Sequence, residues 1–142
     1  GDLRDLHLSL RRQRQMCIRD RIETPSNESA SIYQLLANRG KLFSIAGSGD
    51  YRNYFEVDGI RYSHEIDPRS GNPISHQLAA AFVISESAAE ADALATAFMV
   101  LGLEESKLII EDVNIPAFLI TRKSNNQFES FVSSTFSSYL IN

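Results

Sequence analysis

The feature that most restricts the fold of this chain is an apolar run followed directly by a capped helical pattern. Residues 78–86, "LAAAFVISE", form an almost uninterrupted apolar stretch of strand length, which is typical of a strand buried in a sheet. Residues 87–102, "SAAEADALATAFMVLG", predict a helix, because Ser87 and Glu90 have the spacing of a capping box and Gly102 suits the C-terminal cap. A buried strand followed by a helix is therefore expected here.

The segments that follow predict a second helix and further strands. Residues 104–113 have the pattern of an amphipathic helix, and a short strand is expected over residues 116–121. A final strand is expected over residues 128–134, and the serine-rich tail from Ser133 is expected to fray. Two helices among strands that can pair antiparallel predict an α+β fold, with a mixed, largely antiparallel sheet.

The middle of the chain predicts a β-hairpin. Residues 51–57 and 60–64 are aromatic and β-branched runs separated by Asp58-Gly59, a strong signal for a two-residue turn. This hairpin is expected to place His64 at the end of its second strand. The following residues 67–73, "DPRSGNP", contain two prolines that lack amide donors, so strand pairing is expected to stop there.

The residues before the hairpin give weaker signals. Residues 22–31 are polar and predict a loop. Residues 32–41 are compatible with either a short helix or an irregular strand. Residues 41–51, "KLFSIAGSGDY", predict a buried strand that ends in a tight turn at Gly47-Ser48-Gly49.

Composition and charge exclude several classes of function. The chain has 142 residues, of which 43% are hydrophobic and 23% charged, as expected for one globular domain. No apolar run approaches the roughly 18 residues that a membrane-spanning helix needs. A single cysteine, Cys17, excludes an internal disulfide and a cysteine-based zinc cluster.

The net charge of −4 is unevenly distributed. Residues 1–21 hold six arginines and three aspartates, a net of +3, whereas the rest holds eight Lys/Arg and fifteen Asp/Glu, a net of −7. The acidic body argues against a nucleic-acid-binding surface. The basic segment has neither a clean amphipathic period nor interleaved aromatics, and it resembles translated sequencing-adapter read-through. We predict that it is not part of the natural protein and that the domain begins near Ile22.

Two residues of the predicted helix have side chains suited to a hard metal ion. Asp92 and Thr96 are four residues apart, so both oxygens project from the same helix face. A carboxylate and a hydroxyl are ligands suited to Mg²⁺, which completes its octahedron with water and substrate phosphate. The alternative is structural: Asp92 stabilises the helix dipole, and Thr96 packs its methyl group inward.

The other candidate residues also allow a structural or a functional interpretation. His64 is either a general base or a structural group at a strand end. Arg69 and Ser70 either contact a phosphate or stabilise their loop. The Gly47-Ser48-Gly49 segment offers backbone amides to an anion but lacks the lysine and the spacing of a Walker motif. His7 and His76 have no companions at the spacing of metal ligands.

Taken together, these stretches resemble a known family. Residues 48–76, "SGDYRNYFEVDGIRYSHEIDPRSGNPISH", followed by residues 89–102, "AEADALATAFMVLG", resemble the C-terminal half of the ApbE-like FAD:protein FMN transferase family. The resemblance runs from about Ile22 to Phe128 with the order and spacing of the blocks intact. It implies that residues 22–142 are part of a larger ApbE-like domain and that residues 1–21 are a non-family segment.

The resemblance assigns roles to several of these residues. His64 is expected to be the catalytic base and to lie beside FAD, and Ile66 is expected to contact FAD through its main chain or apolar side chain. Asp67, Pro68, Arg69 and Gly71 are expected to hold the shape of the loop. Asp92 and Thr96 match the Mg²⁺ ligands of the family.

The function implied is the Mg²⁺-dependent transfer of FMN from FAD to a serine or threonine hydroxyl of a target flavoprotein, with release of AMP. The family's N-terminal half, which supplies most of the FAD pocket and a further metal ligand, is not in this sequence. The fragment is therefore expected to be inactive alone. Family members usually act on the periplasmic side of the inner membrane or as exported lipoproteins, which implies a membrane-associated location and a lipid anchor in the missing part.

This chain departs from the family pattern at two places. The family usually has an apolar residue where Glu65 stands, and Ala-Thr-Ser where this chain has Ala46-Gly47-Ser48. Glu65 is expected to point away from the flavin if strand alternation holds. Two further hypotheses remain open: a non-catalytic module of the same family that binds FAD, and an inert α+β segment whose loop residues are only structural.

Overall fold

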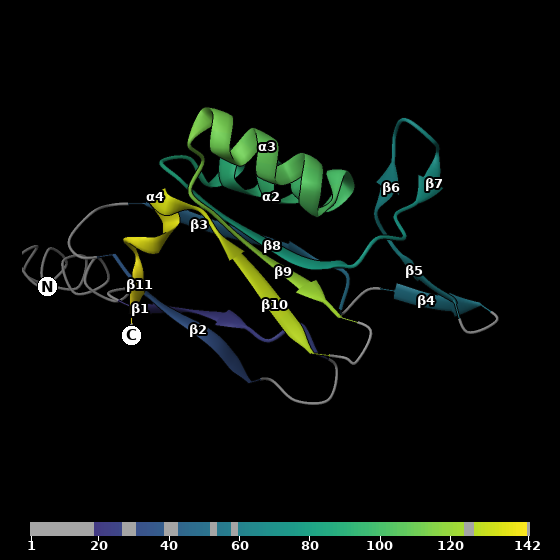
Figure 1. The fold of residues 1–142 in the computed structure, drawn as a ribbon, viewed down its shortest axis with the longest axis horizontal. Helices are drawn as coiled ribbons and strands as arrows, with labels where there is room; N and C mark the ends of the chain where they lie inside the picture. The colour runs from purple at the N-terminus through teal and green to yellow at the C-terminus, as the bar shows by residue number, and fades with distance from the viewer. Residues whose placement is uncertain are drawn as a thin grey trace, which may run out of the picture.

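The computed structural model describes residues 19–26, 31–38, 43–51, 54–57, 60–123 and 127–141. Figure 1 shows strands in a twisted layer with two helices on one side. The strands are β1 Arg19–Glu23, β2 Ile32–Ala37, β3 Ser44–Gly49, β4 Tyr54–Val57, β5 Ile60–Ser63, β6 Ile66–Asp67, β7 Asn72–Pro73, β8 Leu78–Ser85, β9 Ala117–Arg122, β10 Phe128–Val132 and β11 Leu140–Ile141. The helices are α2 Ala88–Leu101, α3 Leu103–Val113 and α4 Ser134–Ser137.

The main sheet has four antiparallel strands in the order β10-β9-β8-β3, and α2 and α3 lie over one of its faces (Figure 1). This arrangement confirms the predicted α+β class. Strand β8 is central and buried on both faces, which explains its continuous apolar sequence. Its Ala81 and Val83 pack toward the helices, whereas Ala80 and Ile84 pack toward the opposite side.

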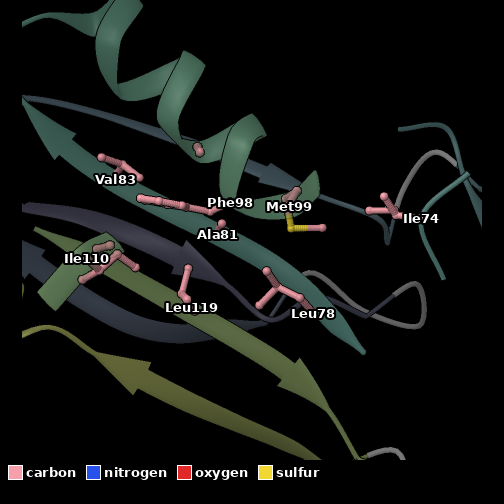
Figure 2. Close-up of a cluster of buried hydrophobic side chains, with 10 residues drawn as sticks. Ile74, Leu78, Ala81, Val83, Phe98, Met99, Ile110 and Leu119 are labelled. Carbon is pink, nitrogen blue, oxygen red and sulfur yellow. The ribbon is translucent and has the colours of Figure 1, made fainter. Parts of the chain in front are cut away.

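The helix-side core is formed where α2 and α3 meet the sheet. Figure 2 shows Phe98 and Met99 of α2 beside the sheet residues Leu78 and Leu119, with Ile110 of α3 completing the cluster. All five side chains are at most 1% exposed. This burial positions α2 firmly against the sheet, and α2 carries the candidate metal ligands.

A second core lies on the opposite face of the main sheet. The smaller sheet, in the order β1-β2-β11, contributes Ile22 and Leu36 to it, and α4 contributes Phe136. Phe136 is fully buried and its ring centroid lies 5.5 Å from that of Phe118. The prediction that the chain frays from Ser133 is therefore wrong, because Phe136 anchors the tail and β11 pairs with β2.

The helix ends confirm Ser87 and Gly102 as caps, but the capping box is formed only in half. The side chain of Ser87 accepts a hydrogen bond from the backbone N–H of Glu90, whereas the Ser87 N–H donates to Ser85 Oγ, and Ser85 Oγ donates to the Glu90 carboxylate. Gly102 has a φ of 81° and its N–H donates to the carbonyl of Phe98. Only this residue separates α2 from α3, so the two helices form one compact layer.

Several sequence-based predictions of local structure need correction. Ile22 and Glu23 belong to strand β1 and not to a loop, and residues 32–37 form a strand, one of the two alternatives. Strand pairing was predicted to stop over residues 67–73, but Ile66 and Asp67 of β6 pair with Pro73 and Asn72 of β7 on the two sides of a tight turn. The hairpin of β4 and β5 is confirmed, although its turn at Asp58-Gly59 lies outside the described residues.

The Gly47-Ser48-Gly49 segment is also not a turn. It forms the end of strand β3, paired with β8. A Cβ atom on Gly47 would lie 2.6 Å from the ring of Phe82, so the glycine is explained by close packing against that ring. Within the part of the chain that is described, no helix is long and apolar enough to span a membrane.

We expect residues 1–18 to be dispensable for stability, whereas residues 19–21 are not. Strand β1 begins at Arg19 and crosses the boundary predicted at Ile22, with Arg19, Asp20 and Arg21 opposite residues of β2. Deleting residues 1–18 should leave the melting temperature unchanged, while deleting residues 1–21 should lower it by a few degrees, since about 1 kcal/mol corresponds to several degrees in a domain of this size. Thermal unfolding followed by circular dichroism tests this. An equal loss in both variants would contradict the non-family assignment of the segment.

A second stability prediction concerns the ion pair between Asp50 and Arg122. Asp50 is 7% exposed, and its carboxylate lies 3.4 Å from the Arg122 guanidinium, which also donates to the carbonyl of Pro25. Asp50→Ala should lower the free energy of unfolding by about 3 kcal/mol, because it leaves a largely buried cation without its partner. The adjacent exposed pair Lys123–Glu129 provides the control, and Lys123→Ala should cost less than about 1 kcal/mol. Denaturation curves measure both free energies of unfolding. Similar losses of this free energy in Asp50→Ala and Lys123→Ala would contradict a special role for Asp50.

Candidate functional site

A cavity of about 350 Å³ lies beside the end of strand β3. Its lining brings His64 together with the glycine-rich end of β3, as well as with residues from β1 and β8. The lining residues are Glu23, Gly47, Ser48, Gly49, Tyr51, His64 and Phe82. The structure therefore places two of the sequence-predicted candidates, His64 and the 47–49 segment, at one site.

His64 follows strand β5 directly and is exposed. The chain is fixed on its C-terminal side, because the N–H of Glu65 donates to Ser63 Oγ at 3.2 Å and the Glu65 carbonyl accepts from the N–H of Ile74 at 3.1 Å. These bonds hold the backbone in a bend that leaves the imidazole at the surface of the cavity. An exposed imidazole beside a cavity can exchange a proton with a bound group.

Strand β3 contributes two glycines and Ser48 to the lining of this cavity. A Cβ atom on Gly49 would lie 2.7 Å from the ring of Tyr51 and 2.9 Å from the carbonyl oxygen of Ala79, so only glycine fits there. The rings of Phe82 and Tyr51 thus pack over the β3 backbone at Gly47 and Gly49. Between the two glycines, Ser48 also lines the cavity.

The β6–β7 arm carries Ile66, which is 57% exposed. Asp67 accepts hydrogen bonds from the backbone N–H and the guanidinium of Arg69, and Arg69 also donates to Glu105 of α3 at 3.0 Å. The hydrogen bond from Arg69 holds the pKa of Asp67 below its ordinary value, and the same bond raises the pKa of Arg69. Gly71 completes the turn with a φ of 71°. The arm is thus held by its own residues and by α3.

Asp92 and Thr96 lie one turn apart on α2, and both are exposed. The buried residues Ala91 and Ala95 beside them face the sheet. Among the described residues, no group of three or more His, Cys, Asp and Glu side chains is arranged to hold a metal ion. One carboxylate with a neighbouring hydroxyl nevertheless fits Mg²⁺, which takes one or two protein carboxylates and fills its remaining positions with water and phosphate.

The candidate metal-ligand pair and the histidine do not line the same cavity. Helix α2, which carries the pair, packs on β3 and also contacts β6 of the arm. The lining of the 350 Å³ cavity includes His64 but neither Asp92 nor Thr96. Any ligand that engages both must therefore extend beyond this cavity.

Sequence reasoning did not identify Glu23, Tyr51 and Phe82 as lining residues. Glu23 lies in a segment that was predicted to be a loop. Phe82 lies in a strand that was predicted to be buried, and it is the one half-buried residue between Ala79 and Ile84. His76 is structural, because its Nε2 lies 2.7 Å from the Met99 carbonyl oxygen and its Nδ1 accepts from the N–H of Leu78. His7 lies outside the described residues.

Comparison with protein families gives a match to the ApbE family over residues 8–119. Two curated relatives are both called FAD:protein FMN transferase. The Vibrio cholerae protein is 41% identical over 119 residues, which are 84% of this chain and 35% of the relative. The Escherichia coli K12 protein is 38% identical over 120 residues, which are 84% of this chain and 33% of the relative.

Solved structures show the same similarity. The apo form of the Pseudomonas stutzeri flavinyl transferase ApbE superposes with a TM-score of 0.70 at 41% identity, covering 85% of this chain and 36% of that one. The flavin transferase ApbE from Vibrio cholerae superposes with a TM-score of 0.72 at 36% identity, covering 86% and 37%. The chain thus spans about a third of the length of the relatives it matches. The family match begins within residues 1–21, so the origin of that segment stays a prediction.

Proposed function

The chain belongs to the ApbE family, and from that membership we propose that it is part of an Mg²⁺-dependent enzyme that transfers FMN from FAD to a serine or threonine hydroxyl of a target flavoprotein, releasing AMP. The observation that carries the proposal is the cavity that the exposed His64 lines together with Gly47, Ser48 and Gly49 of β3. An imidazole at the edge of a cavity is suited to take a proton from a hydroxyl bound there.

The reaction needs one proton acceptor and no covalent enzyme intermediate. The acceptor hydroxyl oxygen forms a bond to the phosphorus of the FMN moiety, the bond from that phosphorus to the AMP oxygen breaks, and AMP leaves. In the proposal, His64 takes the proton of the attacking hydroxyl. Ile66, exposed on the neighbouring arm, contacts FAD and contributes to its orientation.

Asp92 and Thr96 are the residues of this chain that would hold Mg²⁺. When bound, the ion would neutralise pyrophosphate charge and stabilise charge on the leaving phosphate. Asp92 supplies the charged oxygen and Thr96 a neutral one, so the carboxylate should dominate binding. We also propose a membrane-associated or exported location for the whole protein.

The proposal predicts that the 142-residue chain alone has no transferase activity. It spans about a third of its relatives, and a cavity of about 350 Å³ encloses too little of a ligand as large as FAD to offset the cost of ordering it. Activity should require the joined protein, which we define as this chain fused to the portion of the Vibrio cholerae relative that it does not match. Robust FMN transfer by the chain alone would overturn this part of the proposal.

Titration of FAD into the joined protein, with and without Mg²⁺, tests the proposed function. Binding seen by flavin fluorescence together with Mg²⁺-dependent AMP release supports a transferase. Binding without AMP release would instead favour the non-catalytic module that only holds FAD. Absence of both would mean that the loop residues are structural.

A further inference from the structure

A buried carboxylate directly follows the candidate base. Glu65 is 8% exposed, whereas its neighbours His64 and Ile66 are both exposed. Ser48 Oγ donates a hydrogen bond to Glu65 Oε1 at 2.6 Å, a length typical of a hydroxyl bound to a charged carboxylate. Ser48 also lines the cavity that His64 faces. One short bond therefore connects the cavity wall to the residue beside His64.

The backbone of Glu65 is held at the same point. Its N–H donates to Ser63 Oγ, and its carbonyl accepts from the N–H of Ile74. Three bonds thus attach Glu65 to the end of β5, to β3 and to the segment that precedes β8. Because each residue has only two soft backbone dihedrals, fixing residue 65 on both sides restricts where the Cα and side chain of His64 can lie.

The hydrogen bond from Ser48 holds the carboxyl group of Glu65 in its buried position. Glu65 Oε2 is buried and has no hydrogen-bond partner among the residues that the structure describes. A buried carboxylate is costly unless it is hydrogen-bonded, so loss of the Ser48 hydroxyl favours movement of Glu65 toward water. Such a movement would carry the backbone of His64 with it.

We propose that Ser48 and Glu65 form a positioning pair, which holds His64 at the cavity beside the end of β3. Neither residue of the pair is assigned a direct part in the chemistry. The consequence for reaction rate rests on the proposed function, in which His64 is the base. A displaced base loses much of its effect even when it stays near the substrate.

The structural half of this proposal is tested in the 142-residue chain by amide hydrogen exchange over residues 63–66. Ser48→Ala and Glu65→Leu should each speed exchange by about 10-fold or more, the scale of one lost hydrogen bond to a charged group. Glu65→Gln keeps an oxygen acceptor and should restore most of the protection. Ser44→Ala is the matched control, since Ser44 is also in β3 and no side-chain hydrogen bond is described for it. Exchange equal to that of the control would overturn the pair.

The functional half is tested in the joined protein by steady-state kinetics. Ser48→Ala and Glu65→Leu should each lower kcat by about 10- to 100-fold with little change in the KM for FAD, and the double variant should be no slower than either single one. Glu65→Gln should keep most of kcat. A raised KM with unchanged kcat, or additive losses, would contradict a positioning role.

Two further outcomes also decide the proposal. If Ser48→Ala unfolds the chain while Ser44→Ala does not, the bond supports the fold as a whole and positioning is rejected. If the joined protein without substitutions transfers no FMN, the proposed function fails, and the exchange measurement still decides whether Ser48 and Glu65 hold the backbone of His64.

Discussion

His64→Ala in the joined protein should slow FMN transfer by about two to four orders of magnitude, the usual effect of removing a general base. The side chain is exposed at the cavity and the backbone on its C-terminal side is fixed by hydrogen bonds, so the substitution should remove the proton acceptor without disturbing the core. The effect should appear in kcat, measured as AMP released at saturating FAD and acceptor.

Ile66→Ala provides the comparison for His64. Ile66 is also exposed and lies two residues away, but it has no group that can accept a proton. Its loss should raise the KM for FAD and leave kcat within a few-fold of the parent, since apolar contacts bind ground state and transition state alike. Equal losses of kcat in the two variants would indicate that the arm as a whole, and not the imidazole, is responsible.

Asp92→Ala should reduce AMP release to the level seen without Mg²⁺, whereas Thr96→Ala should only raise the Mg²⁺ concentration required. Asp92 is the one carboxylate of the pair, and its loss removes charge from the site, while water can replace a neutral hydroxyl ligand. The measurement is the rate of AMP release as a function of Mg²⁺ concentration in each variant.

Asp112→Ala is the matched control for the metal prediction. Asp112 is an exposed aspartate on α3, so its removal changes the charge of the helical layer by the same amount without touching the pair. The Mg²⁺ dependence should match that of the parent. Normal activity of Asp92→Ala at limiting Mg²⁺ would remove Asp92 and Thr96 from the site.

The strand and helix at the centre of the chain were predictable because local signals and burial agree there. The apolar run of β8 and the caps at Ser87 and Gly102 each predict one element, and both elements form. The tail was mispredicted because its serines suggest a loose end, whereas Phe136 is buried against a distant strand and β11 pairs with β2. No periodic pattern marks a contact of that kind.

The candidate site was predictable only in part. The concentration of chemical groups in residues 61–73 and the i, i+4 spacing of Asp92 and Thr96 are visible in the sequence. The partners of these residues are not, because Ser48 and Glu65 are seventeen positions apart and meet only when β3 lies beside the end of β5. The glycines of β3 were misassigned to a turn for the same reason, since the ring of Phe82 that requires Gly47 comes from another strand.

The central claim is tested most directly by mass spectrometry of an acceptor protein incubated with the joined protein, FAD and Mg²⁺. We expect a mass increase equal to covalently attached FMN on one serine or threonine, together with an equal molar amount of free AMP. Both should disappear when that acceptor residue is replaced by valine. AMP release without modification of the acceptor, or modification that persists in His64→Ala and Asp92→Ala at the parent rate, would contradict the account.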